Sequence, residues 1–131
     1  MFEHPNAKRI RDLFLAFRSG DVAAIDAVIG EDTVWRFPGR RGKIAGEHRG
    51  KNEIFSFLMN VQALTGGTFH LDLADVTASD EHAVAIFRGQ GEREGRRLDN
   101  PTALVIRFKD GKIADLREFV WDLEHVEEFW S

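Results

Sequence analysis

Apolar residues recur at three- and four-residue steps near the start of the chain, which predicts an amphipathic helix over residues 7–19. Asn6 is the expected N-cap of this helix, and Ser19-Gly20 is its expected end. Asp21 is typical of a second N-cap, so a short helix that buries Ile25 follows. A longer helix is predicted over residues 51–64, with apolar residues around most of its circumference. A short acidic helix is expected over residues 123–130.

The pattern changes to strands elsewhere, over residues 33–37, 68–78, 82–92, 97–109 and from 113 to about 122. Asp110-Gly111 between the last two strands favours a tight hairpin turn with positive φ. Residues 40–50 are basic and rich in glycine, and we expect a loop there. The resulting order α-α-β-α-β-β-β-β indicates an α+β fold. We expect a cone-shaped, curved antiparallel or mixed sheet packed on three N-terminal helices, with a short C-terminal helix.

Composition narrows the classes of function. The 131 residues suit a single domain over 1–131, and a net charge of −4 gives no overall footprint for nucleic acid or an anionic membrane. The chain has no cysteine, signal-like segment or long apolar run, so we expect a cytoplasmic protein outside the membrane. The histidines lack the spacing of metal ligands, and no phosphate-binding loop is evident, so neither metal nor cofactor is expected. A local basic cluster is either a solvated loop or an anion-binding rim: Arg36, Arg40, Arg41 and Lys43.

One carboxylate interrupts an apolar row on the last predicted strand. The row that we expect to face inward is Ala114, Leu116, Glu118, Val120 and Asp122. A buried carboxylate must be solvated, paired or used in chemistry. In a dry pocket the pKa of Glu118 would rise and suit a general acid or base. The alternative is a structural ion pair.

Arg88 is the expected partner of Glu118, because it shares a strand face with Ile86 and Gln90. Its guanidinium would either clamp a ligand oxygen or neutralise the carboxylate. Asn100 would aim inward beside Glu118, because it shares its alternation with Thr102 and Leu104. It would orient a carbonyl or hydroxyl group of a ligand, or else satisfy turn backbone groups.

Aromatic and apolar residues are the candidates for the pocket wall. Trp35 and Phe37 alternate on the first strand, and residues of the 51–64 helix would line the opposite wall: Phe55, Leu58 and Met59. Each of these is either ligand wall or ordinary core. His48 precedes that helix near the expected mouth, and it is either a proton shuttle or a solvated loop residue.

Five short motifs are spread along the chain: Gly20-Asp21 with Ala24-Ile25, Glu31-Asp32-Thr33-Val34-Trp35 with Pro38-Gly39, Gly46-x-x-x-Gly50, Asp110-Gly111-Lys112-Ile113 and Glu128-Phe129-Trp130-Ser131. In these motifs the chain resembles the nuclear transport factor 2-like superfamily, with a cystatin-like α+β fold, and within it the SnoaL-like branch. The resemblance covers nearly the whole chain. It implies the fold, and a homodimer through the outer sheet face, but it does not single out one reaction.

The resemblance also bears on catalysis. In limonene epoxide hydrolase-like relatives two carboxylates flank an arginine, and the corresponding positions here are Glu118, Gln90 and Arg88, so the second carboxylate is missing. The phenolic donor of ketosteroid isomerases is also missing, because the chain has no tyrosine. SnoaL-like cyclases need a polar acid or base on the late strands, which Glu118 or Asp122 would supply.

Two hypotheses therefore remain for a protein that binds a small organic ligand. One is a cofactor-free isomerase, cyclase or dehydratase that transfers a proton on a mostly apolar carbonyl or hydroxyl compound. In that case Glu118 moves the proton, while Arg88 and Asn100 hold the developing oxyanion. The other is a non-catalytic binding or accessory protein with the same pocket.

Overall fold

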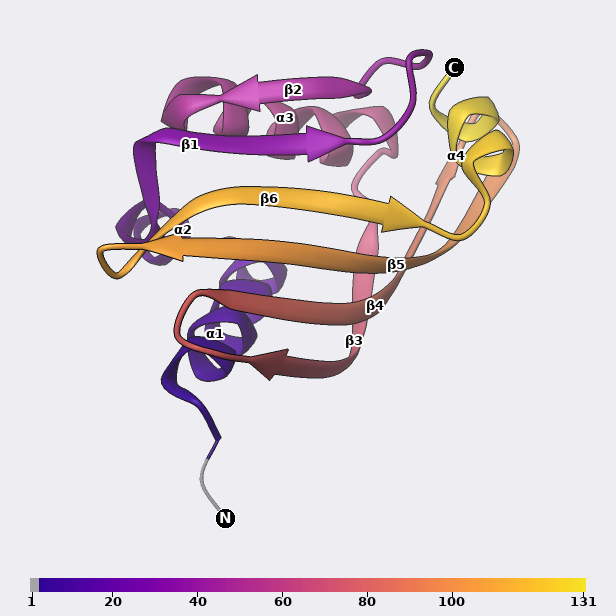
Figure 1. The fold of residues 1–131 in the computed structure, drawn as a ribbon. Coiled ribbons are helices and arrows are strands. Elements are labelled where there is room, and N and C mark those ends of the chain that lie inside the picture. Colours follow the sequence, from indigo (N-terminus) through magenta and orange to yellow (C-terminus); the bar gives the residue numbers. More distant parts are fainter. Residues whose placement is uncertain (1–2) are drawn as a thin grey trace.

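The computed structural model describes residues 3–131 and has a single six-stranded sheet within that range, with helices along one face (Figure 1). The elements in chain order are α1 (Pro5–Ser19), α2 (Val22–Val28), β1 (Ile29–Phe37), β2 (Gly46–Arg49), α3 (Gly50–Leu64), β3 (His70–Ala78), β4 (His82–Arg93), β5 (Arg96–Lys109), β6 (Lys112–Val120) and α4 (Leu123–Trp130). This confirms the predicted α+β class.

The sheet has the strand order β2-β1-β6-β5-β4-β3, so β2 and β3 are its two edges. Strand β1 runs parallel to β6, and every other neighbouring pair is antiparallel. Figure 1 looks onto the outer face of this mixed sheet, with α1, α2 and α3 behind the strands and α4 at one end. The helices therefore enclose the inner face from which the functional residues project.

Helix α1 begins earlier than the sequence predicts, and its N-cap is His4 rather than Asn6. The ring nitrogen Nδ1 of His4 accepts a hydrogen bond from the Asn6 backbone N–H at 3.0 Å. Asn6 is buried instead, and its amide donates to the carbonyl groups of Ser79 and Asp80, each at 3.0 Å. A polar residue with a tertiary role was thus mistaken for a cap.

The segment predicted as a loop over residues 40–50 contains the short edge strand β2. Trp35 on β1 lies opposite His48 on β2 in this antiparallel pair. Helix α3 follows β2 directly at Gly50, whose φ of +78° belongs to the left-handed region. A strand of four residues with no apolar alternation gives little signal in a sequence, which explains the missed element.

The β5–β6 hairpin forms the predicted tight turn, because Asp110 and Gly111 have φ values of 52° and 77°. The register then shifts: Phe108 pairs with Ile113, and Arg107 pairs with Asp115. Ala114 is the extra residue of this bulge, so Ile113 rather than Ala114 belongs to the buried row. Beyond the bulge the row continues with Leu116 and Glu118, as predicted.

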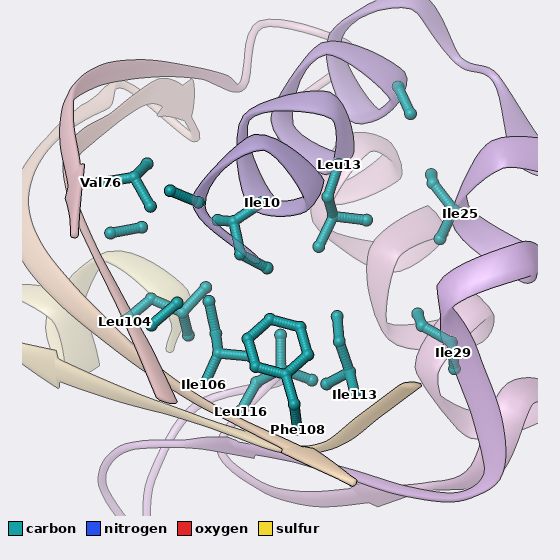
Figure 2. Packing of buried hydrophobic residues seen from close by; sticks show 14 of the residues in the cluster. Ile10, Leu13, Ile25, Ile29, Val76, Leu104, Ile106, Phe108, Ile113 and Leu116 are labelled. Atoms are coloured by element: carbon teal, nitrogen blue, oxygen red, sulfur yellow. The ribbon is translucent and has the colours of Figure 1, made fainter. Parts of the chain in front are cut away.

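Buried apolar side chains form two clusters under the sheet. The larger cluster lies between α1, α2 and strands β3 to β6, and Figure 2 shows its packing around Ile10, Leu104, Ile106 and Leu116. The smaller cluster gathers α4 and part of α3 at one end of the sheet. Trp35 and Leu58 pack against both clusters. No helix among the described residues is long and apolar enough to cross a membrane.

Candidate functional site

A cavity of about 70 Å³ lies between the helices and the inner face of the sheet, where the two clusters meet. This volume is enough to hold water or part of a ligand. Both Trp35 and Leu58, which join the clusters, line it. The full lining comprises Leu13, Phe14, Phe17, Ile25, Trp35, Phe37, Ile44, Phe57, Leu58, Val61, Phe69, Leu71, Phe87, Gly89, Leu98, Asn100, Leu104, Glu118 and Trp130.

Glu118 on β6 is the acidic group of this cavity. Glu118 is only 8% exposed, and Leu104 lies opposite it on the neighbouring strand β5. Trp35 on the neighbouring strand β1 donates its indole Nε1–H to Glu118 Oε2 at 2.8 Å. Burial raises the pKa of Glu118 to about 7, against the smaller lowering effect of the Trp35 hydrogen bond. The carboxyl group is therefore placed to exchange a proton near neutral pH.

Asn100 on β5 is the second polar residue in the cavity lining. It is 5% exposed, and its Oδ1 is buried without a hydrogen-bond partner among the described residues. The inward direction predicted from the strand alternation is correct, because Asn100, Thr102 and Leu104 are all buried. A buried amide oxygen without a partner is costly, so this side chain suits hydrogen bonding to a ligand.

The prediction that Arg88 lies beside Glu118 is wrong. Arg88 is exposed on the outer face of the sheet, where it pairs with Asp99 through contacts of 2.9 and 2.8 Å to the two carboxylate oxygens. Gln90 shares this outer face and hydrogen-bonds His70 at 2.9 Å, so it does not line the cavity either. The inward residues of β4 are instead Phe87 and Gly89.

Both faces of β4 are apolar around Ala83-Val84-Ala85-Ile86-Phe87, which explains the error. The inner face combines the large Phe87 with the small Ala83, Ala85 and Gly89. A Cβ atom added to Gly89 would lie 3.5 Å from the ring of Phe69, which is an ordinary van der Waals contact. The larger Ile86 thus faces outward although its size suggested the core.

Four residues of the predicted wall line the cavity: Trp35, Phe37, Leu58 and Leu104. Their contact with a ligand stays a prediction. Helix α3 contributes Phe57, Leu58 and Val61 to the cavity, so its inward face is rotated from the predicted one and shares only Leu58 with it. Phe55 packs against the larger core cluster, outside the cavity, and Met59 is 71% exposed. Because this helix is apolar around most of its circumference, the sequence did not determine which side faces the cavity.

His48 does not line the cavity. Its ring stacks on that of Phe57 with centroids 4.3 Å apart, and Nε2 lies 2.9 Å from the carbonyl oxygen of Ile44. Three further residues predicted to bind the ligand also lie outside the cavity lining: Thr102, Val120 and Asp122. Thr102 is buried but bonds the backbone carbonyl of Asn100. Val120 packs against the smaller cluster, and Asp122 caps α4 by accepting the His125 backbone N–H at 3.0 Å.

Several cavity residues were not predicted, chiefly aromatic rings contributed by α1, α3, β4, α4 and the residue that precedes β3. The rings missed are Phe14, Phe17, Phe57, Phe69, Phe87 and Trp130. Their signal was the spacing of aromatic residues on α1 and the alternation along β4. It shows which residues are apolar, but it does not distinguish a filled core from a cavity wall.

Among the described residues that line the cavity there is no lysine, arginine or histidine. Glu118 therefore has no cationic counter-group there, and the indole N–H of Trp35 donates a hydrogen bond to it. Within residues 3–131 no three histidine, aspartate or glutamate side chains gather in a way that would hold a metal ion. The cavity is thus an apolar chamber with one carboxyl and one amide group.

Comparison with known proteins identifies the family. Residues 10–116 match the family model of the SnoaL-like domain. The chain belongs to the SnoaL-like family. An uncharacterized protein of Mycobacterium tuberculosis (strain ATCC 25618 / H37Rv) is 31% identical over 123 residues, which are 93% of each chain. The relatedness therefore extends over nearly the whole length.

Solved structures with high similarity to this chain support the expected fold. Bal32a from a soil-derived mobile gene cassette is similar with a TM-score of 0.91 and 38% identity, covering 96% of each chain. A protein of unknown function with a cystatin-like fold from Xanthomonas campestris has a TM-score of 0.86 and 26% identity, covering 95% of this chain and 96% of that one. The neighbours thus confirm the expected fold.

The SnoaL-like fold places only part of the expected catalytic set together. The epoxide hydrolase-like arrangement requires an arginine beside Glu118, and Arg88 is on the opposite face of the sheet. Gln90, at the second carboxylate position, is on that outer face as well. The cavity lining instead brings together three side chains that carry polar groups: Glu118, Asn100 and Trp35.

Proposed function

We propose that this SnoaL-like protein binds a small, mostly apolar carbonyl or hydroxyl compound in the cavity, and that Glu118 transfers a proton to or from it. The observation that carries the proposal is a carboxyl group in an apolar chamber, with its pKa raised to about 7 by burial. Near neutral pH such a group is present both as an acid and as a base.

The proposed chemistry needs no cofactor. Ionised Glu118 would remove a proton from a carbon next to a ligand carbonyl group, and protonated Glu118 would return it elsewhere on the molecule. Asn100 Oδ1, which has no partner among the described residues, would accept a hydrogen bond from a ligand hydroxyl group, and the Nδ2–H of the same amide would donate to a carbonyl oxygen. Isomerisation, aldol-type cyclisation and dehydration all use such transfers. Arg88 has no part in this proposal, because it lies outside the cavity.

A non-catalytic ligand-binding protein is the second candidate. It is favoured by the lining, in which no cationic side chain is present to stabilise an oxyanion. In that case Glu118 and Asn100 would only orient the ligand, and most of the affinity would come from contact with the apolar walls.

Exchange of the α-protons of 2-tetralone in D2O, followed by NMR, tests the proton transfer directly. This bicyclic ketone is uncharged and mostly apolar. We expect the exchange rate to rise with pH as Glu118 ionises around its pKa of about 7. Glu118→Gln should lower the rate by about 100-fold or more, since general acid–base catalysis typically contributes that much, while affinity changes only a few-fold.

Glu124→Gln is the matched control, because it makes the same change at an exposed position on α4. It should leave exchange and binding unchanged. If the wild-type protein binds 2-tetralone without accelerating exchange, and Trp35→Ala weakens binding, the non-catalytic function is the correct one. A measured Glu118 pKa below about 4 would also rule out the acid–base role.

We further propose a homodimer through the outer sheet face. An apolar row crosses three strands there, because Ile86 pairs with Ala103 and Ala103 pairs with Phe119. Ile86 and Phe119 are 51% and 54% exposed in the single chain. Burial of this row against a second copy would remove apolar surface from water.

A further inference from the structure

A second hollow of about 460 Å³ lies outside the cavity, between α1 and the sheet-edge strand β3. We call it the α1–β3 groove. Its lining comprises Arg11, Phe14, Leu15, Phe17, Arg18, Gln62, Phe69, His70, Leu71, Asp72 and Leu73. The groove thus combines apolar side chains with polar and charged ones.

The groove and the cavity share one wall. Four residues line both spaces: Phe14, Phe17, Phe69 and Leu71. Phe17 on α1 and Phe69 before β3 make an edge-to-face contact with ring centroids 6.2 Å apart. A layer of side chains therefore separates the buried chamber from the groove, and rotation of these rings would connect the two.

The two spaces differ in the charged groups that line them. The described residues that line the cavity include the carboxyl group of Glu118 and no cationic side chain, whereas the groove has two guanidinium groups, those of Arg11 and Arg18. The groove also has one carboxylate, that of Asp72, which lies 4.0 Å from the ring of His70. Arg11 is engaged, because it forms ion pairs with Glu3 and Asp75. Arg18, in the last turn of α1, makes no side-chain ion pair with residues 3–131.

This distribution orients a ligand that carries an anion. Its carboxylate would be unpaired inside the cavity and next to Glu118, which is strongly unfavourable. In the groove the same carboxylate would meet the guanidinium of Arg18, which suits carboxylate geometry. Leu15 lies on the groove between Arg11 and Arg18 and is 57% exposed, so the groove also offers apolar contact to a chain.

We propose that the α1–β3 groove is the outer half of the ligand site and that the ligand is an elongated organic acid. Its apolar part, with the carbonyl or hydroxyl group, occupies the cavity, and its carboxylate lies in the groove against Arg18. This inference rests on the proposed function, because it assumes that the cavity is a ligand site. It assigns the substrate class and the entrance, which lies at α1 and β3 rather than near His48.

Binding of octanoate and of 1-octanol, measured by calorimetry at about pH 8, tests this inference. The two probes differ in charge at one end of the same chain. Arg18→Gln should weaken octanoate binding about three- to tenfold, as expected for one partly exposed charge pair, and should change 1-octanol binding less than about twofold. Arg49→Gln is the matched control, because it makes the same charge change at β2, the opposite edge of the sheet.

Brominated acids test the orientation, since bromine quenches the fluorescence of nearby tryptophan. Trp35 and Trp130 line the cavity. We expect 8-bromooctanoate, with bromine at the apolar end, to quench the protein more strongly than 2-bromooctanoate. High salt should reduce the octanoate affinity, because Arg18 is exposed.

The inference is overturned if Arg18→Gln affects both probes equally, if Arg49→Gln has the same effect as Arg18→Gln, or if 2-bromooctanoate is the stronger quencher. In these cases 1-octanol binding and 2-tetralone exchange still support the proposed function. Failure of both octanoate and 1-octanol to bind would instead remove the ligand site that underlies both proposals. Loss of 2-tetralone exchange alone would affect only the catalytic role of Glu118.

Discussion

Individual residues show where a sequence predicts a site and where it does not. Glu118 was predicted to face inward from the apolar alternation of β6, and its 8% exposure confirms this position. Asn100 was predicted inward by the same rule. Arg88 was misplaced because Val84 and Ile86 make the outer face of β4 as apolar as its inner face. The alternation of side chains along a strand determines which residues share a face. Which of the two faces points inward depends on the helices and strands that pack against it.

The titration of Glu118 should be visible in the stability of the protein. Its pKa is about 7 in the folded state and has an ordinary value of 4.5. The folded protein therefore binds the proton more tightly, so this stabilisation is complete below about pH 4.5 and is lost as pH rises through about 7. We expect wild-type unfolding free energy, relative to Glu118→Gln, to fall by about 3 kcal/mol between about pH 4.5 and about pH 8.5.

Urea unfolding of both proteins at these two pH values provides the measurement. The difference between the proteins is used because it cancels the titration of all other groups. An unchanged difference, or one that grows in the opposite direction, would show that Glu118 is not buried as described. The carboxylate of Glu118 would then be solvated, and it would not have the raised pKa on which the proposed proton transfer depends.

At the scale of elements, the helices and long strands were predictable, and the irregular features were not. The apolar periodicity of α1 and the Asp110-Gly111 turn are local properties of the sequence. The bulge at Ala114 and the strand β2 arise from pairing with other strands. These pairings involve residues far apart in the chain, so no local pattern reveals them.

Gly50 at the junction of β2 and α3 gives a prediction at this scale. It has a φ of +78°, and a Cβ atom would lie 2.9 Å from the backbone oxygen of Glu31. Gly66 also has positive φ, at 58°, but open space around it. We therefore expect Gly50→Ala to destabilise the protein by about 2 to 4 kcal/mol and Gly66→Ala by about 1 kcal/mol, in urea unfolding. Equal losses would show that the backbone at Gly50 can move away from Glu31.

At the scale of the whole molecule, the sequence predicted an enclosed sheet face, and the position of the cavity depended on packing. The cavity lies where two apolar clusters meet, and Trp35 and Leu58 belong to the edge of both. Sequence alternation assigns such residues to the interior without showing how well they fill it. This is why the sequence predicted the fold but left Trp35 and Phe37 as either ligand wall or ordinary core.

The outer sheet face provides the prediction for the assembled molecule. Trp121 follows β6 and is 86% exposed, and it adjoins the apolar row of Ile86, Ala103 and Phe119. A two-fold dimer would bring two such rows together and bury both.

We expect sedimentation velocity to show a dimer of the wild-type chain at micromolar concentrations and a monomer for the double variant with Phe119→Lys and Trp121→Lys. Met59→Lys, at an exposed position on α3, should remain dimeric. A monomeric wild-type protein, or loss of the dimer in the Met59→Lys control, would contradict this assembly. The doubly substituted monomer should still bind 2-tetralone, because the cavity is on the inner face of the sheet.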